Sequence, residues 1–575
     1  MRQQPFLTFV NNYQLRTMTK LMRGVLQLLF VTALFHQSAI GQTHEQGFEA
    51  MMMEKWDKAI DVYSSLTKSN NADQLAWLSL SNAWLAKGNK EKALEALNSG
   101  FNANPEGVYA MMINGRQLLL QNRTTESDEQ FQKAIKKAKK DMAAIRQHGE
   151  SYLFYTAPNE RKPNLSKAVD LFKQAIEINP KDFETLMNCG YAYREQGNGG
   201  EAARQFEYAS NFKPKSPLPF YMLGTVYKAG KLNDRFVQNM ESAISLDNSY
   251  TPALRAIADH YYFTRKWEQA KEAYSTLLEK GANLVIEDEM QYANTLFLVK
   301  DYQACTEMVE KIIAKDGSKN YLRRLLGYSY YENGDYSKGQ AIMDEYFKMV
   351  EPEKIVASDY IYQGRLQLKA KQDTATAISY LRKAINKDTA EWGLYQEIGN
   401  LYYTSKDYCN AANCYGIWLD SLKSEAKAID IYRLGICQFY CKEDTLRYQS
   451  ALSSFEKVTQ LMPNAGIGWL WAGKAAARLD VDITVDTSAA AVASFGKAFP
   501  FFSKFVEIAK ADTAKNKKDL ITALEYTVFY HFIRKEDENA KENINLLLSL
   551  DPTNQTATEL QSRLNTQPPP AGGKG

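Results

Sequence analysis

Two ladders of residues with a period near 34 constrain the fold of this chain more than any other feature of its sequence. The first ladder, with steps of 34 to 40 residues, consists of Ala168, Ala202, Phe236, Ala270, Cys305, Gly339, Ala377, Ala411 and Ala451. The second ladder lies upstream in each unit and consists of Gly190, Gly224, Ala258, Ala293, Gly327, Gly364, Gly399 and Gly435. A period of this length indicates stacked supersecondary units rather than unrelated globular domains.

Each unit is predicted to hold two helices, because its apolar positions recur at three and four residues. A large apolar residue follows many members of the first ladder after four positions, as Phe206 follows Ala202. We expect the small residue of the first helix to face this large residue of the second, which lets the two helices approach closely. Short turns such as Gly197-Asn198 and Gly334-Asp335 would join them as antiparallel neighbours.

The unit over residues 183–216 resembles the tetratricopeptide repeat, since the family's positions are held by Gly190, Tyr193, Gly197, Ala202, Phe206, Ala209 and Pro214. The resemblance extends over nearly the whole mature chain, in about 14 units. It implies an all-α fold, a right-handed α-solenoid of helix-turn-helix repeats over residues 42–565 with a concave groove.

Three places depart from the repeat pattern. Phe236 stands where its unit should have a small residue. About seven extra residues surround Pro158 and Pro163, and about 13 extra residues form an irregular insertion at 480–500. We interpret that insertion as a polar surface loop.

Composition narrows the class of protein. The chain has 575 residues, a formal net charge of +3 and 45% hydrophobic residues, which fits a folded soluble protein and argues against wholesale disorder. Length alone would predict roughly four domains, which the repeat pattern replaces with one elongated solenoid. The balanced charge gives no support for nucleic-acid binding. No segment after residue 41 has enough uninterrupted apolar residues to span a membrane.

The first 41 residues predict a secretory signal peptide. Arg16, Lys20 and Arg23 precede an apolar run over residues 25–35, and Ala39-Ile40-Gly41 supplies a small-x-small cleavage site. An uncleaved anchor or a core helix is the competing interpretation, but the run of about 11 residues is shorter than the 20 or so that a spanning helix needs. No Cys lies near the site, so a lipoprotein is not indicated and we expect a periplasmic protein. Initiation at Met18 or Met22 stays open.

The other end of the chain, residues 566–575, predicts a disordered tail, because Pro and Gly dominate it and it has no apolar face to bury.

A search for catalytic or metal-binding motifs finds none in the required context. The five His residues form no H-E-x-x-H motif, and neither type of Gly-rich phosphate-binding loop is present. Residues 480–484 (Asp-Val-Asp-Ile-Thr) resemble the nucleophile motif of haloacid-dehalogenase-type phosphatases, but a helical run precedes them where that motif needs a strand. They also lack the Gly and Glu of a calcium-binding loop. We therefore expect no enzyme activity, no cofactor and no metal.

Four of the six cysteines cluster in two successive units. If the second helix of one unit packs antiparallel on the first helix of the next, Cys409 lies near Cys441 and Cys414 near Cys437. Either pair, or both, would form a disulfide in an oxidising compartment. Buried free thiols are the alternative, because a spacing of five does not place Cys409 and Cys414 on one helix face.

Five tripeptides at or near predicted turns resemble the acceptor pattern of periplasmic O-glycosylation in Bacteroidota. They begin at Asp373, Asp388, Asp420, Asp444 and Asp512. The alternative explanation is chance, since Asp, Ser and Thr are common turn residues.

In tetratricopeptide proteins, ligands mostly lie along the concave face that the first helix of each unit lines. The resemblance places these residues on that face: Tyr191, Arg194, Tyr221, Lys228, Arg255, Tyr262, Asn294, Arg324, Tyr328, Tyr331, Arg365, Asn400 and Tyr403. Tyr, Arg and Asn suit peptide recognition, although residues at such positions also solvate the groove or pack between units. Asn82, Asn294 and Asn400 match the Asn of the family's carboxylate clamp, but the accompanying Lys is missing.

The leading functional prediction is a non-catalytic periplasmic scaffold that binds a protein or peptide segment in its groove. The competing prediction is a glycan-binding protein of the cell envelope that uses groove aromatics, since 12% of the residues are aromatic. An enzyme centred on the insertion is a third class. It has the least support.

Overall fold

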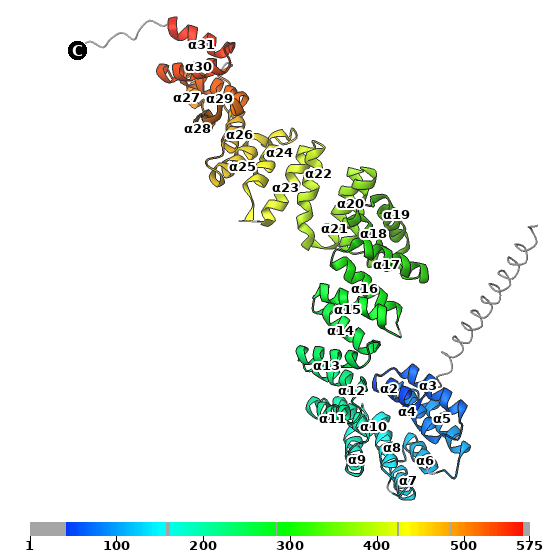
Figure 1. Cartoon of the computed structure of the whole chain (residues 1–575). Coiled ribbons are helices and arrows are strands. Elements are labelled where there is room, and N and C mark those ends of the chain that lie inside the picture. Colours follow the sequence, from blue (N-terminus) through cyan, green and yellow to red (C-terminus); the bar gives the residue numbers. More distant parts are fainter. Residues whose placement is uncertain are drawn as a thin grey trace, which may run out of the picture. The chain divides into compact units, whose positions relative to one another are not determined.

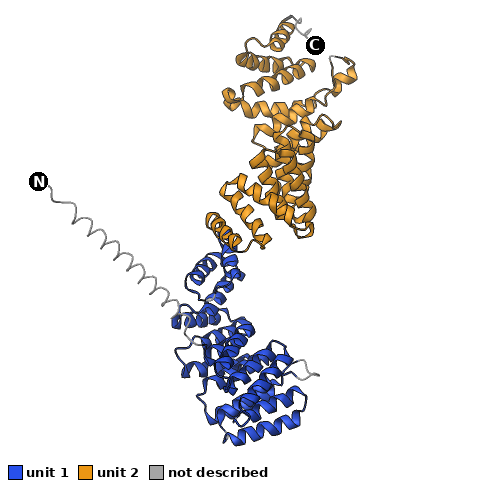
Figure 2. Cartoon of the chain, turned by 90° about the vertical axis from the view of Figure 1, so that its right-hand side faces the viewer, with its two compact units in different colours: residues 1–299 blue, residues 300–575 orange. Residues whose placement is uncertain are grey.

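The structure, a computed structural model, describes residues 42–566 except 108, 140, 157–161, 283, 423–424 and 484. The predicted signal peptide, the insertion at Pro158, Thr484 of the phosphatase-like motif and the tail from residue 567 lie outside the described residues. The chain divides into two compact units, unit 1 over residues 1–299 and unit 2 over residues 300–575 (Figure 2). Within the described ranges, every regular element is a helix.

Unit 1 contains the following helices: α2 (His44–Met52), α3 (Trp56–Ser69), α4 (Gln74–Ala86), α5 (Lys90–Ala103), α6 (Ala110–Leu120), α7 (Thr124–Lys137), α8 (Met142–Phe154), α9 (Leu165–Ile178), α10 (Phe183–Glu195), α11 (Gly199–Phe212), α12 (Leu218–Ala229), α13 (Asn233–Leu246), α14 (Thr251–Phe263), α15 (Trp267–Lys280) and α16 (Ile286–Leu298). They follow one another as antiparallel pairs, α2 with α3 through α14 with α15 (Figure 1).

Unit 2 contains α17 (Tyr302–Lys315), α18 (Asn320–Asn333), α19 (Tyr336–Met349), α20 (Ala357–Lys371), α21 (Thr374–Lys387), α22 (Leu394–Thr404), α23 (Tyr408–Leu422), α24 (Ala428–Tyr440), α25 (Arg447–Leu461), α26 (Gly466–Ala477), α27 (Ala489–Ser494), α28 (Phe499–Ala509), α29 (Thr513–Ile533), α30 (Asp537–Leu550) and α31 (Gln555–Thr566). Single 3-10 turns lie at Pro352–Lys354, Thr389–Gly393 and Lys510–Asp512. At the end of the unit, α31 packs on α29 and α30.

The predicted all-α repeat fold is confirmed. In both units the first helix of a pair packs on its second helix, and that second helix packs on the next first helix, which is the arrangement of an α-solenoid. Most pairs bury their apolar stripe against neighbouring pairs, so the core runs along each unit as a series of clusters rather than around a single centre.

Close approach within a pair depends on the predicted small-against-large contact, which is also confirmed. A Cβ atom added to Gly190 would lie 2.6 Å from the ring of Phe206, and one added to Gly435 would lie 2.7 Å from the ring of Phe455. Both rings are fully buried. The aromatic ring therefore occupies the space that a side chain at the glycine position would need.

The turns inside the pairs share one backbone conformation. Gly88, Gly197 and Gly334 have φ between +79° and +85°, as their Gly-Asn and Gly-Asp turns predict. Lys231 and Lys406 adopt φ of +59° and +60° at the equivalent place without being glycine.

The insertion before α28 differs from the predicted polar loop. It contains the short helix α27, and Ile483, Ala491 and Phe495 are buried against α29. The carboxylate of Asp480 accepts hydrogen bonds from the backbone N–H groups of Gly496 and Lys497, at 3.1 and 2.8 Å, and from the hydroxyl of Tyr526. Residues 485–490 are exposed, as predicted for a surface insertion, but three apolar residues spaced far apart in the sequence anchor it to α29, which the prediction did not include.

Candidate functional site

The first helices of neighbouring pairs approach one another on one face of each unit. In unit 1, α8 contacts α6 and α10 and also reaches α4, and in unit 2, α18 contacts α20. Because a first helix touches the next first helix and even the one beyond, this is the inner side of the stack. We call it the first-helix face; the sequence-predicted groove residues belong to it.

Three arginines of the predicted set form forked pairs with a carboxylate of the following first helix. The pairs, with N–O distances of 2.6 to 3.1 Å, are Arg255 with Asp288, Arg324 with Asp359, and Arg365 with Glu397. Forked Arg–carboxylate hydrogen bonds are strong and directional. The hydrogen bonds that Arg255 and Arg365 donate to Asp288 and Glu397 hold the pKa values of the two guanidinium groups above their usual range. These arginines therefore join successive repeats.

The predicted tyrosines and Asn400 of unit 2 divide into buried and exposed groups. The hydroxyl of buried Tyr328 donates to Asp359 Oδ1 at 2.7 Å, and Tyr331 is half-buried beside Tyr362. Asn400 Oδ1 accepts from the hydroxyl of Tyr415 at 2.6 Å. Tyr403, in contrast, is 39% exposed.

In unit 1, three further predicted residues have neighbours in the same or an adjacent pair. The Lys228 ammonium lies 5.3 Å from the centre of the Phe236 ring, and Tyr262 packs edge-on against Trp267. Asn294 is half-buried on α16.

The remaining predicted residues of unit 1 lie beside the segment at α2 and its following residues Met53 and Glu54. Tyr191 is only 6% exposed, and its hydroxyl lies 3.4 Å from Glu54 Oε1. Arg194 stacks on the Tyr191 ring and is ion-paired with Glu54, which directly follows α2. Tyr221 packs edge-on against Tyr250, whose hydroxyl donates to Met53 Sδ at 3.6 Å. This part of the first-helix face already holds a helix.

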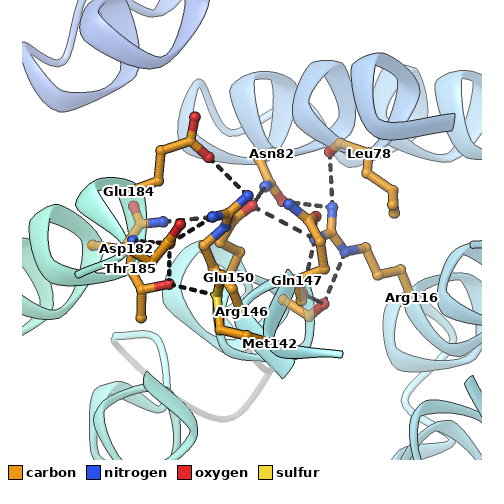
Figure 3. Close-up of polar contacts among 12 residues, drawn as sticks. Leu78, Asn82, Arg116, Met142, Arg146, Gln147, Glu150, Asp182, Glu184 and Thr185 are labelled. Atoms are coloured by element: carbon orange, nitrogen blue, oxygen red, sulfur yellow. Dashed lines mark hydrogen bonds and ion pairs between the residues drawn. The ribbon is translucent and has the colours of Figure 1, made fainter. Parts of the chain in front are cut away.

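Next to it lies a buried polar network that joins α4, α6 and α8 (Figure 3). Arg116 on α6 is 2% exposed, and all of its N–H donors have acceptors at 2.8 to 3.0 Å. These acceptors are the Leu78 carbonyl and Asn82 side chain on α4, and the Gln147 carbonyl, Gln147 side chain and Ser151 hydroxyl on α8. The arginine thus cross-links three repeats from inside.

Glu150 on α8 is the buried carboxylate of this region. Its two oxygens accept from Asn82 on α4 and Asn188 on α10, each at 3.1 Å, and Arg116 and Arg146 lie 4.0 and 3.6 Å away. Arg146 also pairs with Asp182 and Glu184 on α10, at 2.7 and 2.8 Å (Figure 3). Burial raises the pKa of Glu150 and lowers the pKa of Arg116 to about 10.

Sequence analysis missed this network. Its signal was present, because Arg116 and Glu150 directly follow Gly115 and Gly149, two glycines that continue the second ladder upstream of Gly190, on a helix face that the repeat must bury. A charged residue at that position needs partners from adjacent repeats.

The structure contains a disulfide between Cys409 at the start of α23 and Cys441 at the end of α24, with Cα atoms 4.7 Å apart. Cys414 and Cys437, the other candidate pair, are buried free thiols. The antiparallel packing of α23 on α24 therefore brings one of the two pairs together and leaves the other unbonded.

Most aspartates of the predicted glycosylation tripeptides have structural partners. Asp373 and Asp512 cap α21 and α29 by accepting from the N–H groups of Thr376 and Lys515, at 3.0 and 3.1 Å. Asp388 and Asp444 accept from backbone N–H groups two residues on, at 2.9 and 2.8 Å. Turn and cap formation accounts for these residues without a modification.

Among the described residues, no group of three or more His, Cys, Asp or Glu side chains could hold a metal ion. Over the same residues, every helix is too short or too polar to cross a membrane.

The paired helices and their packed inner face define an α-helical repeat protein, and comparisons with known proteins agree. The tetratricopeptide repeat family profile matches residues 45–100, which contain α2 to α5. The C-terminal part of a TPR repeat-containing protein from Cytophaga hutchinsonii is 30% identical, over 47% of this chain and 98% of that one, with a TM-score of 0.34. A tetratricopeptide repeat protein from Parabacteroides merdae is 18% identical, over 39% of this chain and 87% of that one, with a TM-score of 0.26.

Among curated proteins, the DnaJ homolog subfamily C member 7 homolog of Schizosaccharomyces pombe is 20% identical over 230 residues, which are 39% of this chain and 42% of that protein. A probable N-acetylglucosaminyltransferase SPINDLY of Hordeum vulgare is 27% identical over 115 residues, which are 19% of this chain and 12% of that protein. The chain thus spans less than half the length of these curated relatives. With 30% identity over nearly all of the Cytophaga fragment, this chain belongs to the tetratricopeptide repeat family.

Proposed function

We propose that the protein is a non-catalytic scaffold of the periplasm that binds a segment of another protein on the first-helix face of unit 2. Tetratricopeptide repeats are typically protein-binding and generally non-catalytic. The export signal predicted in residues 1–41 supports the periplasmic location.

One observation carries the proposed binding surface. Tyr403, Tyr408, Tyr440 and Trp471 form a continuous chain of ring contacts across α22, α23, α24 and α26, with successive ring centres 5.2 to 6.1 Å apart. We call these four residues the aromatic strip. Tyr403 and Tyr440 are 39% and 45% exposed. Tyr408 and Trp471 between and beside them are half-buried. Exposed aromatic side chains on a packed aromatic base are typical of interaction sites, where Tyr and Trp are enriched among the residues that contribute most binding energy.

The strip also has apolar neighbours that extend it along the same first helices. Ile429 at the start of α24 and Ile467 at the start of α26 are 52% and 43% exposed. A partner segment lying across α22, α24 and α26 would cover all of these side chains at once.

The test is a pull-down from cell-envelope extract with the full chain, comparing the wild type with the double variant Tyr403→Ala/Tyr440→Ala. Tyr208→Ala is the matched control, because Tyr208 is as exposed but lies on a second helix, α11. We expect the wild type and the control to recover the same protein and the double variant to lose it. Recovery of no protein by the wild type, or equal recovery by all three, would contradict the proposal.

The location has its own test. Sequencing the N-terminus of the protein isolated from its own cells should give Gln42 as the first residue, and osmotic shock should release it with periplasmic markers. An N-terminus at Met1, Met18 or Met22 would exclude cleavage after Gly41.

The aromatic strip also favours a second candidate, a glycan-binding protein, since exposed aromatic faces stack on sugar rings. A glycan array probed with the same variants separates the two. Saccharide binding that the wild type shows and Tyr403→Ala/Tyr440→Ala loses, with no protein recovered in the pull-down, would favour the glycan.

A further inference from the structure

The start of the described chain is folded onto repeats far along the sequence. The N-terminal segment, residues 44–55, comprises α2 and the short link to α3. It lies against α10, and it contacts Lys213, directly after α11, and Tyr250, directly before α14. The residues in these contacts are more than 130 positions apart in the sequence. We call the surface that it covers the seat.

Charge complementarity holds one side of the N-terminal segment. Glu45 pairs with Lys213 at 2.9 Å, and Glu54 pairs with Arg194. Glu49, between these two, lies near Tyr250, and burial together with the negative charge of Glu49 raises the pKa of the Tyr250 hydroxyl. Glu45 and Glu49 lie one turn apart on the same face of α2, so an acidic stripe of the segment meets a basic and hydroxyl-bearing stripe of the seat.

Apolar residues hold the adjacent side of the helix. Phe48 packs edge-on against Phe183 on α10, with ring centres 6.4 Å apart. Met52, one turn further, is 1% exposed and belongs to the main core of unit 1. A Phe and a Met at i and i+4, flanked by glutamates, are the anchors of an amphipathic helix in a groove.

The seat is larger than the helix that fills it. A cavity of about 190 Å³ lies on one side of α2, between it and α4, α8 and α10, and a recess of about 560 Å³ lies on the other, lined by Phe48, Lys213 and Tyr250 among others. Moreover, α2 has 9 residues, whereas the first helices α4, α10 and α14 have 13.

The link that joins α2 to α3 is short and has the same left-handed turn as the links inside other pairs, such as those at Gly197 and Lys231. It consists of Met53, Glu54 and Lys55, and Glu54 adopts φ of +57°, so the helix ends there and does not continue into α3. A helix of nine residues has little stability of its own in water. Its order therefore depends on its contacts with α3 and with the seat.

We propose that the seat is a helix-binding site that α2 occupies in cis, and that its partner in trans is an acidic amphipathic helix, longer than α2, with Phe and Met on its apolar face. This rests on the proposed function and adds a second, gated surface in unit 1. A longer helix of this chemistry repeats the contacts of Glu45, Phe48 and Met52 and fills the two voids. Tethering gives α2 an effective concentration of about millimolar, so the free chain keeps the site closed to weak ligands.

The experiment uses the full chain and a fluorescent peptide of residues 42–56. In the release variant Glu45→Lys/Glu54→Lys, both substituted side chains are largely exposed, so the fold should persist while two seat contacts are lost. We expect the peptide to bind the release variant at least about tenfold more tightly than the wild type, because the cis competitor is weakened. Hydrogen exchange of residues 44–55 should rise in the release variant without a change in α18 to α21.

Two matched controls make the result specific. A peptide with Phe48→Ala and Met52→Ala should not bind either chain. In a chain that carries Arg194→Glu/Lys213→Glu, the seat charges are reversed; a peptide with Glu45→Lys and Glu54→Lys should bind it, and the unaltered peptide should not.

Equal peptide affinity for the wild type and the release variant, or no binding to the release variant, would overturn this inference. Its failure is distinguishable from failure of the proposed function, because the pull-down reports on the aromatic strip of unit 2. A negative peptide result with a normal pull-down removes only the gated site, whereas a pull-down without a partner removes the proposed function.

Discussion

At the scale of single residues, the inner side of unit 1 is held together by charges that the interior would normally exclude. A buried guanidinium is tolerated only when its donors are satisfied, and Arg116 achieves this with acceptors from α4 and α8. The arginines and tyrosines predicted to line the inner face cannot simply be taken as ligand contacts. Most of these side chains already have partners within the chain.

Arg116→Met should lower the free energy of unfolding by about 3 kcal/mol or more, because it leaves the buried acceptors of Asn82 and Gln147 without their donor and removes one of the two cations beside Glu150. Arg123→Met should leave it nearly unchanged, since Arg123 pairs with Glu126 at the surface, where solvent screens the interaction. Urea titration followed by circular dichroism measures both. Equal effects of the two substitutions would show that the network is not a stabilising cross-link.

His148 predicts a dependence of stability on pH. It is buried against Phe131 with no hydrogen bond to either ring nitrogen, and burial lowers its pKa to about 4. The unfolded chain binds the proton near its ordinary pKa of about 6.5. Between these values the unfolded state holds more protons than the folded state, so stability falls as the pH is lowered from about 6.5 to 4.

We expect this one residue to account for up to about 3 kcal/mol of that loss. The check is a comparison of the urea midpoints of wild type and His148→Leu at pH 7.5 and pH 4.5. The wild type should lose more than the variant on acidification. A parallel loss in both proteins would assign the pH dependence to other groups.

At the scale of helices and helix pairs, the spacing between two helices is set by one absent side chain. Gly435→Ala places a methyl group 2.7 Å from the buried ring of Phe455 and should destabilise unit 2 by about 1 to 3 kcal/mol. Gly416→Ala is its control on the neighbouring helix α23, where the added Cβ meets nothing within 4 Å. That change should stabilise by about 0.5 to 1 kcal/mol through helix propensity. Thermal unfolding should shift in opposite directions; shifts of the same sign would contradict the packing argument.

The disulfide also acts between two helices, because it joins α23 to α24 across 32 residues of the chain. Denatured, unreduced protein should show four free thiols, from the Cys residues at 189, 305, 414 and 437. Cys409→Ser should lower the free energy of unfolding by about 3 to 4 kcal/mol, the value expected for a loop of this length. A count of six thiols in protein isolated from its own cells would show that the bond does not form there.

At the scale of the whole molecule, contacts run between neighbouring pairs, so a local defect should stay local. In the Gly435→Ala variant we expect faster hydrogen exchange in α22 to α26 and unchanged exchange in α2 to α9. Peptide-resolved mass spectrometry checks this, with the Gly416→Ala variant beside it. Faster exchange throughout both units would mean that the chain unfolds as one cooperative body.

The N-terminal segment is the exception to this local pattern in unit 1. Glu45, Glu54 and Met53 contact residues more than 130 positions later, so α2 couples the first repeat to α10, α12 and α14. A variant that releases α2 should therefore speed exchange in two separated stretches of unit 1, residues 44–55 and α10 to α14.

The sequence by itself determined the helix pairs, their turns and the small-against-large contacts, because these depend on residues within about one repeat of each other. Gly190 with Phe206 is a local pairing that a 34-residue period predicts. The same period also placed arginines such as Arg324 on the inner face. It could not show that the carboxylates 32 to 35 residues further on would take them as partners.

Only the tertiary structure decided which of those inner surfaces are open. Whether Tyr191 faces a ligand or the chain's own N-terminal segment depends on the small rotation between each repeat and the next, summed over several repeats. No local sequence pattern encodes that sum. The same accumulation brings Arg116 between α4 and α8 and closes the seat. The sequence period specifies how each repeat packs on the next. Which surfaces remain accessible for binding depends on the summed geometry of many such packings.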